Sequence, residues 1–162
     1  MIGALILGAM MATGVPQGQA RTSLGIFQGW GVFRDASPRR CFAIARPVGP
    51  AVASQPFASI ATWPGDGVRG QIHIRLSRTR NPRSRVMLSV GERRFELMAG
   101  ERDAWAPDTR TDLAIVAAIR QGRSMSVETM GTNGGAFADT YALQGAATAI
   151  DAAALGCLRR QG

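Results

Sequence analysis

At 162 residues, the chain has the length of one domain with an ordinary hydrophobic core. Hydrophobic residues make up 46% and charged residues 19%, a composition that excludes disorder of the whole chain. All 19 basic residues are arginine, a bias that resembles genome composition, and the formal net charge of +8 allows attraction to anionic surfaces without indicating a fold.

The first 20 residues, MIGALILGAMMATGVPQGQA, carry no charge. Their apolar run is too short for a comfortable membrane span, and Gly18 and Ala20 supply the small residues of a cleavage site. We therefore predict a signal peptide over residues 1–20, cut before Arg21, with no stable membrane span in the mature protein. A basic residue at its start is missing, and an uncleaved anchor is the alternative. The predicted location is the periplasm or the exterior.

Residues 21–162 are predicted to form a single domain that is mainly β. Short runs of β-branched and aromatic residues alternate with Gly, Pro and Asp, a pattern typical of antiparallel sheets. We expect a β-sandwich or barrel-like domain of about eight strands and two short α-helices. The expected strands are 25–33, 41–47, 56–62, 70–76, 85–90, 93–98, 124–130 and 136–143.

Two turns fix the pairing of neighbouring strands. Gly91 and Glu92 form a two-residue loop with glycine first, as a type II′ turn requires. This register places Leu88 opposite Phe95 and Val86 opposite Leu97. Farther on, Asn133-Gly134 is a strong reversal signal, so the strands on either side of it are expected to pair.

Two segments have helical patterns. In the first, Thr109 is expected to cap the helix together with Asp112, and Gly122 to end it. The second is rich in alanine, and Gly156 is its expected C-cap. Its apolar stripe at helical spacing consists of Leu143, Ala147, Ile150, Ala154 and Cys157.

The two cysteines, Cys41 and Cys157, lie near the two ends of the predicted fold. An exported chain with two cysteines most simply forms one disulfide. A metal pair or a reactive thiol is the alternative, but a single histidine and the absence of a CxxC motif suit neither. We expect no metal and no cofactor.

Several short motifs occur in a fixed order along the chain. They are GWGVF around Trp30, CFAIARP from Cys41, RRFELM, DAWAP with Trp105, DLAIVAAIRQGRSMSV, DTYAL, GAATAI and finally Cys157. In this order, over about residues 26–158, the chain resembles the invasion-associated locus B family of exported bacterial proteins. The resemblance implies the fold and an exported location, and the family's name implies a role in host interaction. It supplies no catalytic residue.

No catalytic residue is predicted. His73 stands on the solvent side of its strand, and Asp139 shares a face with apolar residues, where a carboxylate must be hydrogen-bonded or paired. We expect Asp139 to cap a turn or to meet an arginine. The leading hypothesis is an exported, non-enzymatic protein that binds an envelope component or a partner protein. The alternative is a periplasmic hydrolase with an unrecognised site.

An arginine-rich segment is the most suggestive surface feature. Such a cluster can bind the phosphate or sulfate groups of lipopolysaccharide or of an anionic glycan. Nucleic acid is disfavoured, because no aromatic residues are interleaved with the cations. The alternative is a solvated loop, and the oligomeric state stays open. The five residues of the predicted anion site are Arg75, Arg78, Arg80, Arg83 and Arg85.

Three tryptophans, Trp30, Trp63 and Trp105, are candidates for a sugar site, although tryptophans in small β domains more often belong to the core or its rim. We expect Trp63, in TWPGDG, to be the most exposed of the three.

Overall fold

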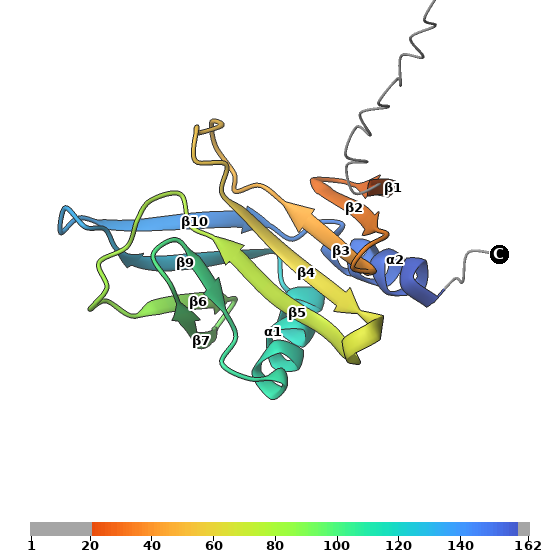
Figure 1. Ribbon diagram of the computed structural model, residues 1–162. Helices are drawn as coiled ribbons and strands as arrows, with labels where there is room; N and C mark the ends of the chain where they lie inside the picture. Colours follow the sequence, from red (N-terminus) through yellow and green to blue (C-terminus); the bar gives the residue numbers. More distant parts are fainter. Residues whose placement is uncertain (1–20, 159–162) are drawn as a thin grey trace, which may run out of the picture.

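The computed structural model describes residues 21–158, so the predicted signal peptide lies outside the described residues (Figure 1). This part of the chain forms a ten-stranded antiparallel sheet, two α-helices and one 3-10 turn. In chain order the elements are β1 (Arg21–Phe27), β2 (Trp30–Asp35), β3 (Arg40–Ala45), β4 (Phe57–Trp63), η1 (Pro64–Asp66), β5 (Val68–Arg75), β6 (Val86–Val90), β7 (Arg93–Ala99), β8 (Asp103–Trp105), α1 (Thr109–Gln121), β9 (Ser124–Met130), β10 (Ala136–Ala142) and α2 (Ala146–Leu158).

The strands follow the order β1-β2-β3-β4-β5-β8-β7-β6-β9-β10, which is linear, so the sheet is not closed into a barrel. It is nevertheless folded upon itself. The Trp30 indole N–H of β2 donates to the Ala142 carbonyl at the end of β10, over 3.0 Å. The Val48 amide, in the loop after β3, donates to the Thr140 carbonyl. The predicted mainly β, antiparallel fold with two helices is thus confirmed, in a sandwich-like form.

Each helix covers a different part of the sheet. Helix α2 packs on β1 to β4, and α1 packs on β5 to β7, as Figure 1 shows for α2 beside β2 and β3 and for α1 beside β5. Within residues 21–158, no helix has the length and apolar character that crossing a membrane requires. The largest fully buried side chains are Trp30, Tyr141, Ile72, Ile74, Leu76, Leu88, Ile115, Ile119 and Met125, with three valines.

The predicted disulfide is present. Cys41 of β3 and Cys157 in the last turn of α2 are joined, with their Cα atoms 5.6 Å apart and a sequence separation of 116. The bond ties the last helix to the first half of the sheet, so the Ala-rich C-terminal segment is held in place covalently.

The N-terminal strand prediction was wrong in one respect. Residues 25–33, expected as one strand, belong to the hairpin of β1 and β2, which turns at Gln28 and Gly29. Gln28 adopts a left-handed φ of 55°, a conformation that a sequence pattern read as continuous β does not anticipate. The three-residue strand β8 was also missed, because a strand so short carries no alternation to detect.

Both predicted turns are confirmed. Leu88 pairs with Phe95 and Val86 with Leu97 across the β6–β7 hairpin. Gly91 has a positive φ of 58° and Glu92 does not, as a type II′ turn demands. Strands β9 and β10 pair over their whole length around the Asn133-Gly134 turn.

Gly122 is the C-cap of α1, as predicted, but the two other predictions of helix ends were wrong. Asp108, not Thr109, caps α1, because its carboxylate accepts the Thr111 amide at 2.7 Å. Asp112 instead accepts a hydrogen bond from the sheet. Gly156 lies inside α2, which continues to Leu158. The buried face of α2 is also rotated from the expected stripe: it consists of Ala146, Ala149, Ile150, Ala153 and Cys157.

Candidate functional site

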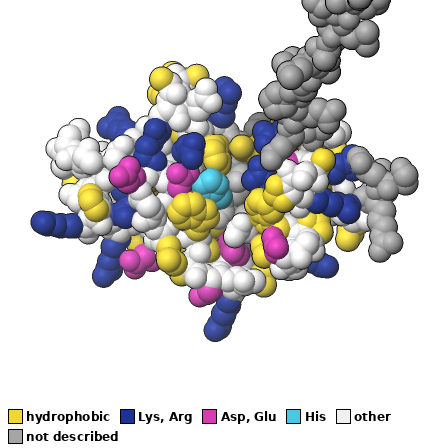
Figure 2. Space-filling model, viewed as in Figure 1, with side chains coloured by type: hydrophobic (Ala, Val, Ile, Leu, Met, Phe, Trp, Pro, Cys, Tyr) yellow, Lys and Arg dark blue, Asp and Glu magenta, His cyan; other side chains and the backbone are white. Residues whose placement is uncertain are grey.

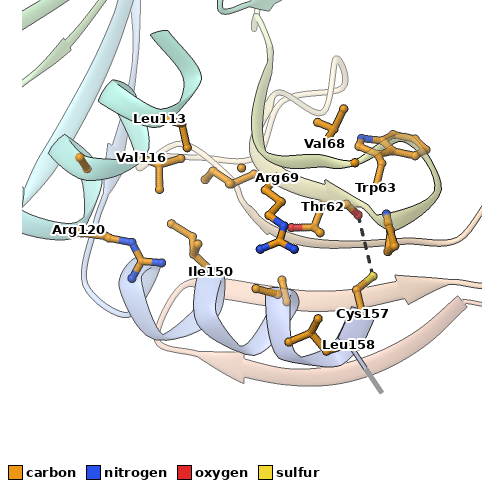
Figure 3. Close-up of a pocket in the computed structure, with 17 residues that line it drawn as sticks. Thr62, Trp63, Val68, Arg69, Leu113, Val116, Arg120, Ile150, Cys157 and Leu158 are labelled. Atoms are coloured by element: carbon orange, nitrogen blue, oxygen red, sulfur yellow. Dashed lines mark hydrogen bonds between the residues drawn. The ribbon is translucent and has the colours of Figure 1, made fainter. Parts of the chain in front are cut away.

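A groove runs between α1 and α2 over one end of β4 and β5 (Figure 3). Its volume is about 470 Å³, within the range of small-molecule sites. The groove lies where the two helices part, each covering its own section of the sheet. It is lined by Ile60, Thr62, Trp63, Pro64, Gly67, Val68, Arg69, Gly70, Leu113, Val116, Ala117, Arg120, Ile150, Ala153, Ala154, Cys157 and Leu158.

The walls of the groove are apolar, and small residues keep it open. Leu113 and Val116 line it from α1, and Ile150 lines it from α2 (Figure 3). Ala153 and Ala154 add little bulk on the α2 side, so the Ala-rich segment leaves space for the groove. At the rim, Leu113 is 55% exposed and Leu158 is 69% exposed. These two leucines leave apolar surface in water at the edge of the groove.

Arg69 reaches into the groove because of an irregularity in the sheet. The register between β4 and β5 shifts between Ala61 and Trp63, so that Arg69 and Gly70 together lie opposite one residue, Thr62. Such a β-bulge re-aims side chains. Regular alternation would put Arg69 on the face of Gln71, away from the helices.

Gly70 makes this bulge possible. Its φ is +72°, in the region that favours glycine, and a Cβ there would come within 3.3 Å of Val116 on α1. The same glycine therefore serves the backbone of the bulge and the close approach of α1.

Two guanidinium groups meet the groove, and they differ in their partners. Arg120, at the end of α1, donates to Asp151 of α2 at 2.7 Å, and this hydrogen bond raises the pKa of Arg120. Arg69 makes no hydrogen bond or ion pair with any residue of the described chain. Figure 3 shows its side chain extending toward α2 beside Thr62. One uncompensated positive charge, on an exposed side chain, therefore borders the apolar walls of the groove.

The disulfide closes one end of the groove. Cys157 lies on the lining, and its sulfur is 3.9 Å from the Thr62 carbonyl (Figure 3). Because Cys157 is bonded to Cys41, it is no nucleophile. The polar groups on the lining are the hydroxyl of Thr62, the indole N–H of Trp63, which already donates to Gln71, and two guanidinium groups.

The predicted anion site is divided by the structure. Arg80 is used internally: it donates to the backbone carbonyls of Ala99 and Gly100 at 2.7 and 2.6 Å, and to others in its own loop. Arg75 donates to Asp103, and Arg85 lies 3.6 Å from Glu96.

Arg78 and Arg83 are exposed, and the Arg78 guanidinium lies 5.7 Å from the centre of the Phe137 ring. The structure therefore gives Arg80 a clear structural role. The five arginines, predicted as one anion site, have separate surroundings.

His73 is less open to solvent than predicted. Its Nε2 lies 2.8 Å from a carboxylate oxygen of Asp103, its ring stacks on Trp105, and Phe57 meets it edge-on. Burial raises the pKa of Asp103, but hydrogen bonds from Arg75 and His73 outweigh it, so the pKa is lowered. Figure 2 shows the histidine with acidic and hydrophobic side chains beside it. A neighbouring carboxylate and two aromatic rings thus hold the imidazole in place.

Asp139 has the structural role predicted for it. It is buried, and its carboxylate accepts the Ser77 amide at 2.8 Å, which ties the segment after β5 to β10. Desolvation, followed by the charge of Asp139, raises the pKa of the buried Tyr141 hydroxyl. Asp139 also lines a second cavity, of about 460 Å³, together with Arg46 and Arg78.

The tryptophans divide between core and surface. Trp30 is fully buried. Trp105, not Trp63, is the most exposed of the three, at 38%. Trp63 is half-buried, donates to the Gln71 amide oxygen, and forms part of the groove wall. The expectation of an exposed Trp63 was therefore wrong.

No local pattern in the sequence indicates the groove. Its lining comes from β4, β5, α1 and α2, which are distant in sequence, and Arg69 faces it only through the bulge. The signal that could have revealed Arg69 is GDGVRG, where closely spaced glycines interrupt the strand pattern. Within residues 21–158, no cluster of three or more His, Cys, Asp or Glu side chains is arranged to hold a metal ion.

No family model, curated protein or solved structure matches this chain. The function must therefore be inferred from the geometry of the chain's own residues.

Proposed function

We propose that this chain is an exported, non-enzymatic binding protein of the periplasm or cell surface, and that the groove between α1 and α2 binds a component of the envelope. The observation that carries the proposal is the groove itself: about 470 Å³ of largely apolar space, with two exposed leucines at its rim and one exposed, unpaired guanidinium on its lining. An apolar cleft with a few polar groups is the usual form of a ligand site.

Two further observations support export. The disulfide between Cys41 and Cys157 is of a kind that persists in oxidising compartments. The apolar, uncharged residues 1–20 have the composition of a signal peptide. The resemblance to the invasion-associated locus B family agrees with export. Membership of that family and a role in host interaction remain predictions.

Export is tested by expressing the full chain in a bacterium and measuring the mass of the protein recovered from the periplasm by mass spectrometry. We expect a chain that begins at Arg21 and is lighter by the two hydrogens of the disulfide. An uncleaved precursor in the cytoplasm, with two free thiols, would refute this part of the proposal.

Binding in the groove is tested with Nile red, a neutral dye that fluoresces in apolar sites. Ala154→Leu adds bulk to the groove wall and is expected to weaken dye binding at least tenfold. Thr148→Leu makes a comparable addition at an exposed position of α2 outside the groove lining, and is expected to leave binding unchanged. Equal binding by the wild type and both variants would place the dye elsewhere and count against the groove.

The alternative, a hydrolase, has one observation in its favour, the pairing of His73 with Asp103, because a carboxylate that orients an imidazole occurs in hydrolytic sites. Its test is turnover of ester, peptide or glycoside substrates by the mature protein. Activity that disappears in His73→Ala or in Asp103→Asn would replace the binding proposal with a catalytic one.

A further inference from the structure

We propose that the ligand of this groove is a single-chain amphiphilic carboxylate, a free fatty acid of medium length, with its head at Arg69 and its chain along the wall between α1 and α2. This inference rests on the proposed function and names the chemical class that the groove selects.

The charge at the groove favours an anionic ligand. Arg69 lacks a partner within the described chain, whereas Arg120 is neutralised by Asp151 at 2.7 Å. The groove therefore presents one uncompensated positive charge. A guanidinium binds a carboxylate through two parallel hydrogen bonds, which a neutral alcohol cannot match and a cation would oppose.

The apolar wall of the groove favours a ligand with a hydrocarbon chain. Leu113, Val116 and Ile150 form a surface that an acyl chain would remove from water, and the exposed Leu113 and Leu158 gain most from being covered. Each methylene group buried contributes about 0.8 kcal/mol of transfer free energy. Small residues on α2 leave the space for the chain without rearrangement.

The length of the groove wall sets the length of the hydrocarbon chain. The α2 lining extends from Ile150 to Leu158, which at about 1.5 Å per residue is about 12 Å of wall. With carbon–carbon bonds of about 1.5 Å, a zigzag chain of roughly ten carbons covers this distance. One groove and one free charge suit one chain and one carboxylate, so a free acid is favoured over a phospholipid with two chains.

The test uses the mature protein, residues 21–162, and three ten-carbon probes that differ only in the head group: decanoate, decanol and decylamine. Displacement of Nile red measures each affinity at pH 8. We expect decanoate to bind at least about tenfold more tightly than decanol, the size of effect that one charge-assisted pair gives. Decylamine is expected to bind most weakly, and the preference for decanoate should shrink as salt is raised.

Variants locate the effect. Arg69→Gln is expected to abolish the preference for decanoate over decanol while leaving the affinities for decanol and Nile red unchanged, because it removes the charge and keeps the wall. Arg69→Lys keeps the charge but not the fork, and should retain part of the preference. Arg94→Gln removes an exposed arginine of β7 that does not line the groove, and should change nothing.

The outcomes separate the two proposals. If neither Nile red nor decanol binds, the groove is not a ligand site and the proposed function fails. If both bind and decanoate binds no better than decanol, the groove stands and the fatty-acid inference is overturned. Binding to phosphatidylglycerol vesicles without binding of decanoate would also overturn it, in favour of a membrane surface.

Discussion

At the scale of single residues, two buried carboxylates connect separate elements by hydrogen bonds, and their surroundings shift their pKa values in opposite directions. Asp112 of α1 accepts the Ile72 amide of β5 at 2.8 Å, and Asp35 of β2 accepts hydrogen bonds from Arg21 and Arg40. Burial, and to a smaller extent the charge of Asp108, raises the pKa of Asp112, although the hydrogen bond from Ile72 opposes this. The hydrogen bond from Arg21 lowers the pKa of Asp35.

For Asp112 we expect the two obvious substitutions to act in opposite directions. Asp112→Ala leaves the Ile72 amide without a partner and should reduce the free energy of unfolding by about 1–3 kcal/mol. Asp112→Asn keeps an acceptor oxygen and removes a charge that burial disfavours, so at pH 7 it should be at least as stable as the wild type. Urea unfolding measures both. Equal losses in the two variants would show that the charge, not the hydrogen bond, matters.

The pH dependence of Asp112→Asn follows from the raised pKa. A carboxyl group with a raised pKa in the folded state favours folding most at low pH, and this contribution is lost as pH rises through the folded pKa. Any advantage of Asp112→Asn over the wild type should therefore be largest at pH 7 and disappear below about pH 4. An advantage independent of pH would contradict this account.

For Asp35 the sign is reversed. A lowered pKa means that the ionised carboxylate stabilises the fold above its ordinary titration range, and that this contribution is lost as pH falls through the folded pKa. Asp35→Asn should be less stable than the wild type by about 1 kcal/mol at pH 7, a value kept small because Arg21 is half-exposed. The difference should vanish in acid, below about pH 3. Thermal unfolding from pH 2 to 7 measures it.

At the scale of elements, the entry to α2 depends on one glycine. Gly145 has a φ of +81°, and a Cβ there would collide with the backbone carbonyl of Phe27 in the β1–β2 turn. Its own carbonyl accepts the Ala149 amide, in the first turn of α2. The glycine thus lets the helix begin against the N-terminal hairpin.

Two glycine-to-alanine variants separate backbone strain from collision. Gly134 also has a positive φ, +78°, but nothing lies within 4 Å of its Cβ position. Gly134→Ala should therefore cost only the strain of a left-handed residue, about 1 kcal/mol. Gly145→Ala should cost roughly 3 kcal/mol, because the hairpin or the helix must also move. Equal losses, measured by urea unfolding, would mean that α2 and the hairpin adapt to each other freely.

Local patterns predicted most elements because their causes are local. The hairpin at Gly91 and Glu92 and the turn at Gly134 depend on residues next to one another, and both were placed correctly. The division of the first strand at Gln28 was missed, because a non-glycine residue with positive φ leaves no trace in a pattern of alternation.

The groove could not be predicted from the sequence, because its parts meet only in the folded chain. Arg69 faces it only because a bulge reverses its side of the strand, and the walls meet only when α1 and α2 dock on neighbouring parts of the sheet. The hydrogen bond between Asp112 and Ile72 is equally non-local: from the sequence alone, Asp112 looked like part of a helix cap.

At the scale of the whole molecule, the disulfide joins the two ends of the fold and holds α2 against the sheet beside the groove. Closing a loop of 116 residues contributes about 4–5 kcal/mol in the chain-entropy model. The double variant Cys41→Ser, Cys157→Ser should lose a stability of that order, measured by urea unfolding. A loss below about 1 kcal/mol would show that packing alone fixes α2.

The most direct test of the central claim, that the groove between α1 and α2 binds a fatty acid, is a crystal structure of the mature protein with decanoate. We predict one chain of density between Val116 and Ile150, ending in a carboxylate within hydrogen-bond distance of the Arg69 guanidinium. Decanoate bound instead among Arg75, Arg78 and Arg83, or in the cavity beside Asp139, with the groove holding only water, would contradict the account.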